Sequence, residues 1–186
     1  MSEKSLKLNR AIRNFIADKT NALDFGCGTG SLALSLSDKC GVITGIDSSP
    51  RMIAYAKKHT KPSNVEFLLI NRGKKLSDVF HQKFDYIIFK MVIHENPEEE
   101  RITLINEAKK ISAELIIVEW TAPQPNNING IMTWFFELIA AKEHFSNFKQ
   151  WHTKGGLDGF LDRSGLIIVQ EEVFKNKTGK IVRVHW

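Results

Sequence analysis

The chain has 186 residues, of which 42% are hydrophobic and 25% are charged. These values exclude a disordered or low-complexity chain, and the length predicts one domain over residues 1–186. The net charge of +5 is mild, so it permits an anionic partner such as RNA without requiring one. The two cysteines, Cys27 and Cys40, form neither a zinc pattern nor a disulfide framework, and we expect no bound metal.

The N-terminal segment predicts a helix rather than a targeting signal. Residues 1–19 are charged and amphipathic, and apolar side chains recur at helical spacing over residues 4–19. No apolar run reaches the roughly 18 residues that a membrane span needs. We therefore expect an N-terminal helix within residues 1–20 and a cytoplasmic protein without a membrane partner.

A glycine-rich turn follows the first predicted strand. Residues 22–25 are mostly apolar, glycines then alternate at Gly26, Gly28 and Gly30, and a helical pattern resumes from Ser31. Glycine permits positive φ angles, and without a Cβ atom it lets a ligand approach bare backbone. The helix start offers unpaired N–H groups and a partial positive charge to an anion. This pattern predicts a binding loop, with an ordinary strand-to-helix turn as the alternative.

An acidic residue ends the second predicted strand, residues 42–46. Asp47 lies about 20 residues after the first glycine, where dinucleotide-binding units carry an acid for the ribose hydroxyls. A carboxylate can accept bonds from both hydroxyls at once. The alternative is that Asp47 opens an Asx turn ahead of Ser49 and Pro50. In either case, Ser49 would cap a helix over residues 50–59 that starts at Pro50.

Strands and helices alternate along the rest of the chain until a final hairpin. Further strands are predicted at residues 65–70, 84–89, 115–118, 167–174 and 180–185, and further helices at 31–38, about 76–80, 98–111, 131–139 and 156–163. This order predicts an α/β fold whose seven-stranded sheet is mostly parallel, with one antiparallel strand contributed by the hairpin. Glu95, Glu119 and His152 are weak candidates for a catalytic base, and a solvated or capping role is favoured for each.

Ligands of open α/β sheets bind beyond the carboxyl ends of the strands. The glycine loop, Asp47, Asn71 and residues 90–94 all follow predicted strand ends. We therefore expect them to meet at one rim of the sheet, although they are far apart in sequence.

Residues 23–30, Leu-Asp-Phe-Gly-Cys-Gly-Thr-Gly, and residues 45–47, Gly-Ile-Asp, resemble motif I and the acidic loop of class I S-adenosylmethionine (SAM)-dependent methyltransferases. Residues 84–89, leading into Val92-Ile93-His94, resemble the family's fourth-strand segment, and the resemblance covers roughly residues 23–186. It implies a Rossmann-like three-layer αβα sandwich. It also implies SAM as cofactor and methyl transfer to a small-molecule acceptor by in-line displacement.

The resemblance also assigns cofactor-binding residues. These are Asp24, Phe25, Gly26, Cys27, Gly28, Gly30, Asp47, Ser48, Met52, Asn71, Arg72 and Lys90. Met52 would lie near the adenine ring, with core packing as its alternative. Asn71 departs from the acid that many relatives carry, although its side-chain carbonyl could accept a bond from the adenine amine. Lys90 stands where metal-dependent catechol-type relatives have an acid, which disfavours a metal.

By family analogy, an insertion over residues 121–152 contributes acceptor contacts. The candidate substrate residues are His94, Trp120, Trp134 and Phe135. The predicted helix 131–139 is apolar nearly all round and must be covered by substrate, core or a second subunit, so monomer and homodimer both stay open. His94 is the candidate catalytic base because its unperturbed pKa lies near neutrality, and a structural role is its alternative.

Other function classes share parts of this pattern. An NAD(P)-dependent Rossmann oxidoreductase has the same strand, turn and acid, but its loop normally reads G-x-G-x-x-G, and here Gly30 comes one residue early. A non-catalytic SAM-binding or scaffold protein could use the aromatic surface near Trp134. RNA or protein as acceptor is compatible with the charge, but no aromatic-basic stretch of known type supports a nucleic-acid partner.

Overall fold

The computed structural model describes residues 3–60, 62–140 and 142–186. Within them, seven strands form a single sheet: β1 (Asn21–Phe25), β2 (Val42–Asp47), β3 (Val65–Leu69), β4 (Phe84–Lys90), β5 (Ser112–Trp120), β6 (Ile167–Val173) and β7 (Gly179–His185). The helices are α1 (Glu3–Ile12), α2 (Ser31–Leu36), α3 (Pro50–His59), α4 (Leu76–Val79), α5 (Glu98–Ile111), α6 (Ile128–Ala140), α7 (Lys142–Thr153) and α8 (Gly156–Ser164), and a 3-10 turn η1 (Arg13–Phe15) follows α1.

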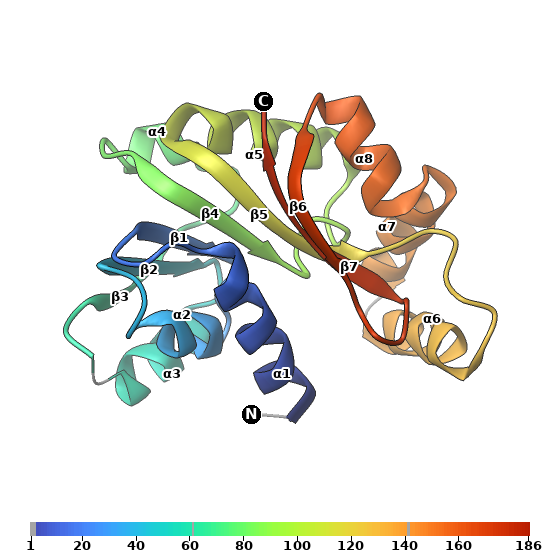
Figure 1. Cartoon of the computed structure of the whole chain (residues 1–186), viewed down its shortest axis with the longest axis horizontal. Helices are drawn as coiled ribbons and strands as arrows, with labels where there is room; N and C mark the ends of the chain where they lie inside the picture. Colours follow the sequence, from blue (N-terminus) through green and yellow to red (C-terminus); the bar gives the residue numbers. More distant parts are fainter. Residues whose placement is uncertain (1–2, 61, 141) are drawn as a thin grey trace.

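The sheet has the order β3-β2-β1-β4-β5-β7-β6. Its strands are parallel except β7, which pairs antiparallel with both β5 and β6. Helices cover both faces, with α1, α2 and α3 on one side and α4, α5 and α8 on the other (Figure 1). The prediction of a three-layer αβα sandwich with one antiparallel strand from a C-terminal hairpin is therefore confirmed.

Strand β4 shows why the central strands read as continuous apolar runs. Ile87 and Phe89 point into the core layer shared with α5 and α8, whereas Tyr86 and Ile88 point into the layer shared with α1, α2 and α3. Successive residues of a strand face opposite sides of the sheet. A strand buried on both faces therefore needs an apolar residue at nearly every position.

The register of the sheet brings the strand ends level. Phe25, the last residue of β1, pairs with Ile46 on one side and with Phe89 on the other. The residues that follow each of these three therefore emerge at one edge of the sheet. This is the edge to which the sequence assigned the binding loop.

Several elements differ from the prediction. The N-terminal helix ends at Ile12 rather than near residue 19, because the chain passes through the η1 turn before β1. Strand β5 runs over nine residues instead of four, since its ends pair with β4 and β7. The insertion contains a second helix, α7, where the sequence indicated only one; residues 1, 2 and 141 lie outside the described part of the chain.

Candidate functional site

A cleft of about 840 Å³ opens at the carboxyl edge of the sheet. Nine of the twelve predicted cofactor-binding residues line it: Phe25, Gly26, Gly28, Asp47, Ser48, Met52, Asn71, Arg72 and Lys90. The other three do not reach its wall. Asp24 and Cys27 are buried, and Gly30 packs against Phe67 on the core side of the loop.

The glycine loop presents bare backbone to this cleft. Gly26 and Gly28 have positive φ angles of 71° and 52°, which side chains rarely adopt. A Cβ atom on Gly26 would lie 2.4 Å from the Cγ2 atom of Val92, so this position requires glycine for space as well. A Cβ atom on Gly28 would meet nothing within 4 Å, because that stretch of backbone faces the open cleft.

Asp47 connects the loop to the second strand. One carboxylate oxygen accepts a hydrogen bond from the backbone N–H of Gly28 (2.9 Å), and the other accepts from that of Ser49 (2.8 Å). Ser49 in turn caps α3 by accepting from the N–H of Met52 at 3.4 Å. The Asx turn that the sequence left as an alternative is thus present. Each oxygen keeps a second lone pair, which still leaves acceptors for ribose hydroxyls.

Beneath the loop, the buried carboxyl group of Asp24 lies near the half-buried ammonium group of Lys90. Burial raises the pKa of Asp24 to about 7, and nearby Lys90 limits the rise. Burial also lowers the pKa of Lys90, whose Nζ atom donates to the Oδ1 atom of Asn9 at 2.6 Å. Asn9 donates to the carbonyl of Ser31 at 3.1 Å, which ties α1 to the start of α2. One oxygen of Asp24 is buried with no hydrogen-bond partner among the described residues.

Cys27 has no features of a reactive thiol. Burial raises its pKa above the usual range, and the side chain is only 8% exposed. A thiol in such surroundings stays protonated and is a poor nucleophile. The structure therefore gives Cys27 a packing role inside the loop.

Apart from residues 90–94, which the sequence placed at this rim, one wall of the cleft was not predicted. It is built by the segment after β3, the segment after β4 and one face of α5, with lining residues Gly73, Lys74, Lys75, Leu76, Met91, Val92, Glu95, Asn96, Glu99, Glu100, Thr103, Leu104 and Glu107. The rule that ligands bind beyond strand ends could have identified the first two segments. The α5 face could not have been found in this way, because its acidic first turn is equally typical of a solvated helix start.

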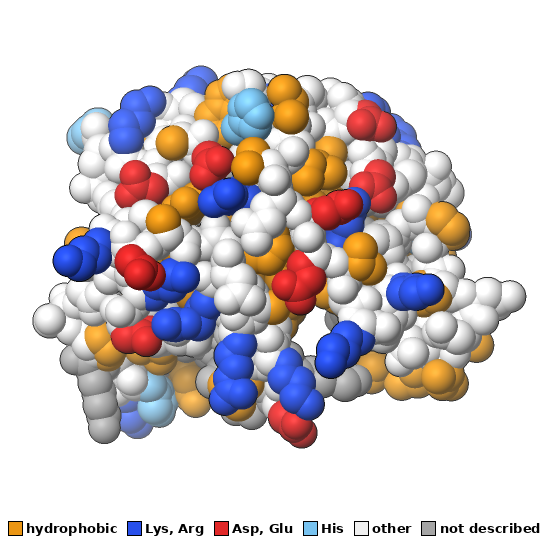
Figure 2. All heavy atoms as spheres, viewed as in Figure 1, with side chains coloured by type: hydrophobic (Ala, Val, Ile, Leu, Met, Phe, Trp, Pro, Cys, Tyr) orange, Lys and Arg blue, Asp and Glu red, His pale blue; other side chains and the backbone are white. Residues whose placement is uncertain are grey.

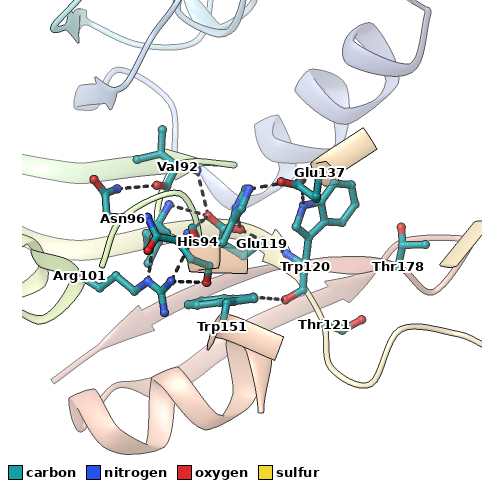
Figure 3. Close-up of polar contacts among 12 residues, drawn as sticks. Val92, His94, Asn96, Arg101, Glu119, Trp120, Thr121, Glu137, Trp151 and Thr178 are labelled. Atoms are coloured by element: carbon teal, nitrogen blue, oxygen red, sulfur yellow. Dashed lines mark hydrogen bonds and ion pairs between the residues drawn. The ribbon is translucent and has the colours of Figure 1, made fainter. Parts of the chain in front are cut away.

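A second polar cluster lies behind the loop that follows β4 (Figure 3). At its centre is Glu119 on β5, which is fully buried and not solvated or capping as the sequence indicated. Its Oε1 atom accepts from the backbone N–H groups of Val92 (2.9 Å), Ile93 (2.7 Å) and His94 (3.3 Å). Its Oε2 atom lies 2.6 Å from Nδ1 of His94.

His94 lies between two carboxylates. Its Nε2 atom is 3.5 Å from Glu137 of α6, whose carboxylate also accepts from the indole N–H of Trp120 at 2.8 Å. Burial alone would lower the pKa of His94, but Glu119 and Glu137 outweigh it and raise this pKa to about 10. The side chain is 2% exposed and does not line the cleft. At neutral pH it is an imidazolium in an ion pair, which is the arrangement expected for the structural alternative.

Arg101 of α5 binds the same loop from the other side. Its Nε atom donates to the carbonyl of Ile93 at 3.1 Å, and one Nη atom donates to those of His94 (3.1 Å) and Asn147 (2.8 Å). Its guanidinium lies 5.2 Å from the ring centre of Trp151. The loop is therefore fixed through its N–H groups by Glu119 and through its carbonyls by Arg101.

The structure separates the predicted substrate residues. Trp120 joins the His94 cluster through Glu137. Trp134 packs between α6 and α7, with its ring 4.8 Å from that of Phe148. Phe135 lies on the outer face of α6 and is 51% exposed. Among the described residues, no group of three or more His, Cys, Asp or Glu side chains is arranged to hold a metal ion.

Comparison with known proteins identifies the family of this chain. Residues 16–171 match the family model described as "Methyltransferase domain". The chain belongs to the class I SAM-dependent methyltransferase family. Its relatives include a malonyl-(acyl-carrier protein) O-methyltransferase of Acetivibrio thermocellus, 39% identical over 38% of this chain and 24% of that protein. A ubiquinone biosynthesis O-methyltransferase of Coxiella burnetii is 25% identical over 78% of this chain and 66% of that protein.

Solved structures of other proteins share the fold of this chain. A protein from Pyrococcus horikoshii OT3 superimposes with a TM-score of 0.73 at 21% identity, covering 99% of this chain and 92% of that one. The N-methyltransferase NodS from Bradyrhizobium japonicum, in complex with S-adenosyl-L-homocysteine, gives a TM-score of 0.66 at 18% identity, covering 98% and 85%. The chain spans between a quarter and two thirds of the length of the two curated relatives described above.

Gly26→Ala and Gly28→Ala form a matched pair that tests the loop geometry. Both variants should lose about 1–2 kcal/mol of unfolding free energy, because each puts a side chain at positive φ. Gly26→Ala should lose a further roughly 1–3 kcal/mol, since its methyl group overlaps Val92. Denaturant unfolding measures both values. Equal losses would contradict the described contact between Gly26 and Val92.

The pKa of His94 predicts a pH-dependent contribution to stability. A histidine whose folded pKa is raised stabilises the fold fully below its unfolded pKa of about 6.5 and loses this contribution as the pH rises through about 10. The difference in unfolding free energy between the wild type and His94→Gln should therefore shrink over that interval. Exposed His81 provides the control variant, His81→Gln. An imidazole NMR titration of His94 centred near pH 6.5 would refute the ion pair.

Proposed function

We propose that this chain is an enzyme that transfers a methyl group from SAM to a small-molecule acceptor. The observation that carries the proposal is the backbone of Gly28, which faces the cleft beside the Asp47 carboxylate in a member of a methyltransferase family. Bare backbone and one acid with spare lone pairs at this rim suit a nucleoside with a charged tail.

The residues around the loop fit the parts of SAM. Asp47 would accept from the ribose hydroxyls, and Met52 with Asn71 would face the adenine. The methionine end carries one carboxylate and one ammonium group. Lys90, which lines the cleft, and Asp24 beneath it offer one charge of each sign close together. The unpaired oxygen of Asp24 supports this match, because a buried polar atom without a partner is uncommon.

The chain's contribution to the reaction is placement. SAM supplies a methyl group on a positively charged sulfur that leaves as a neutral sulfide, so the reaction needs no metal. The protein must align the acceptor with that methyl group and exclude water, and proximity and orientation can then contribute most of the rate. The loop at residues 91–96 forms the wall beside the glycine turn, and Glu119 and Arg101 fix its shape.

We assign His94 a positioning role rather than the role of base that its intrinsic pKa suggests. With a pKa of about 10, it already carries its proton at neutral pH and cannot accept another. The acceptor atom would then attack through a lone pair and would not need His94 to remove a proton.

Because both described cysteines are free and buried, we also propose that the chain works in a reducing cytoplasm.

The small-molecule class of the acceptor rests on the relatives. Two of them bear the names of O-methyltransferases, one for malonyl-(acyl-carrier protein) and one of ubiquinone biosynthesis. The apolar side chains of Phe25, Met91 and Val92, which line the cleft, favour an acceptor with an apolar portion.

Asp47→Ala tests the donor site directly. The variant should bind SAM about 10- to 100-fold more weakly, since it loses charge-assisted hydrogen bonds of roughly 1.5–3 kcal/mol. The SAM affinity of Asp47→Asn should lie between those of Asp47→Ala and the wild type, because the amide keeps one acceptor oxygen. Isothermal titration calorimetry gives the affinities, with Asp78→Asn on α4 as the control. Undiminished affinity in Asp47→Ala, or tighter binding of NADH than of SAM by the wild type, would count against the proposal.

The dependence of turnover on pH tests the role of His94. Once an acceptor is identified, kcat can be measured against pH. The wild-type profile should have no inflection near pH 6.5 that is lost in His94→Gln. A positioning role predicts that His94→Gln lowers kcat while leaving the shape of the pH profile unchanged. A wild-type inflection near pH 6.5 that the substitution abolishes would make His94 the base.

A further inference from the structure

The outer face of α6 is apolar and uncovered in the described structure. The helix turns Thr133, Trp134 and Glu137 inward. Six large apolar side chains point outward and are more than half exposed: Ile128, Ile131, Phe135, Phe136, Leu138 and Ile139. Scattered apolar side chains are normal on protein surfaces, but a contiguous patch of this kind marks an interaction site.

This face also lacks charge. Glu137 is the only charged residue between Thr121 and Ala140, and its carboxylate is directed toward His94 and Trp120. A solvated helix face normally carries charged side chains. The occupant of this surface must therefore itself be apolar where it meets α6.

Two exposed lysines lie in a turn that contacts the segment leading into α6. They are Lys175 and Lys177, in the turn between β6 and β7. This turn is joined to the segment before α6, because the N–H of Thr121 donates to the carbonyl of Thr178 (3.1 Å) and the side chain of Gln124 donates to the same carbonyl (2.9 Å). Figure 2 shows basic side chains along the lower part of the molecule and apolar ones at its lower right, where Figure 1 places α6.

We propose that α6 docks on an anionic lipid surface, with its outer side chains among the lipid chains and Lys175 and Lys177 at the headgroups. An apolar helix face, with two lysines in the turn that contacts the segment before it, matches the two layers of such an interface. The helix is 13 residues long, and no helix in the described part of the chain is long and apolar enough to cross a bilayer. This docking departs from the expectation of no membrane partner, which rested on the lack of a spanning segment. It does not depend on the methyl transfer proposed above.

A second copy of the chain matches this surface less well. In Figure 1, α6 lies at an outer corner of the molecule, so it presents a single convex helix rather than a broad face. A stable protein interface usually buries about 800 Å² per partner. A second α6 would also offer Lys175 and Lys177 no acid on its outer face, whereas anionic headgroups provide one. Charge complementarity therefore favours lipid.

Vesicle co-sedimentation tests the docking. The wild type should bind vesicles of phosphatidylcholine with phosphatidylglycerol more tightly than vesicles of phosphatidylcholine alone, and added salt should weaken the binding. The double variant Phe135→Asp/Phe136→Asp should bind at least about tenfold more weakly, because it removes two aromatic side chains from the interface. Lys175→Gln/Lys177→Gln should reduce binding to the anionic vesicles by about tenfold or more.

The matched control is Ile102→Asp, which changes an exposed apolar side chain on α5 and should bind as the wild type does. A Phe135→Cys variant labelled with a polarity-sensitive dye gives an independent readout, since both native cysteines are buried, and its emission should shift to the blue on anionic vesicles. The proposal is overturned if the wild type does not bind, or if the α6 variants bind equally well. It is also overturned if the wild type forms a dimer through α6 and ignores vesicles.

Discussion

The carboxylate of Glu119 determines the shape of the site. It receives three successive backbone N–H groups and the imidazolium of His94, and so it fixes the turn that the chain makes after β4. Within this turn Met91 adopts a positive φ of 57°, and Val92 is brought against Gly26. The glycine loop and the loop after β4, which come from different strands, thus form neighbouring walls of one cleft through a single buried anion.

Such a network is stable only when nearly every polar group has a partner. An isolated buried carboxylate would be costly, but Glu119 is paired with His94, and Arg101 binds the carbonyls on the far side of the turn. Glu137 extends the network to α6, so the position of that helix depends on the charge of His94. The same contact keeps the only charge of α6 turned inward and leaves its outer face to apolar side chains.

Local pattern was enough to predict the sheet, the glycine loop, the cap of α3 at Ser49 and the meeting of strand ends at one edge. These features depend on residues close in sequence or on the general geometry of parallel sheets. The role of Glu119 could not be predicted, because its partners lie 25 to 27 residues away and the residue itself looks like a polar strand end. Helix α7 and the α5 wall could not be predicted for the same reason, since only packing across the molecule distinguishes their inner faces from solvated ones.

Glu119 shapes the cleft at the carboxyl edge of the sheet from behind. The most direct test is the affinity of S-adenosyl-L-homocysteine for Glu119→Gln, measured by calorimetry on protein whose fold is verified by circular dichroism. Although Gln keeps an acceptor oxygen, it loses the charge that binds three N–H groups and His94. The affinity of Glu119→Gln should be lower by about tenfold or more, since hydrogen bonds to charged groups contribute roughly 1.5–3 kcal/mol each. A folded Glu119→Gln protein with wild-type affinity would show that Glu119 does not shape the cleft.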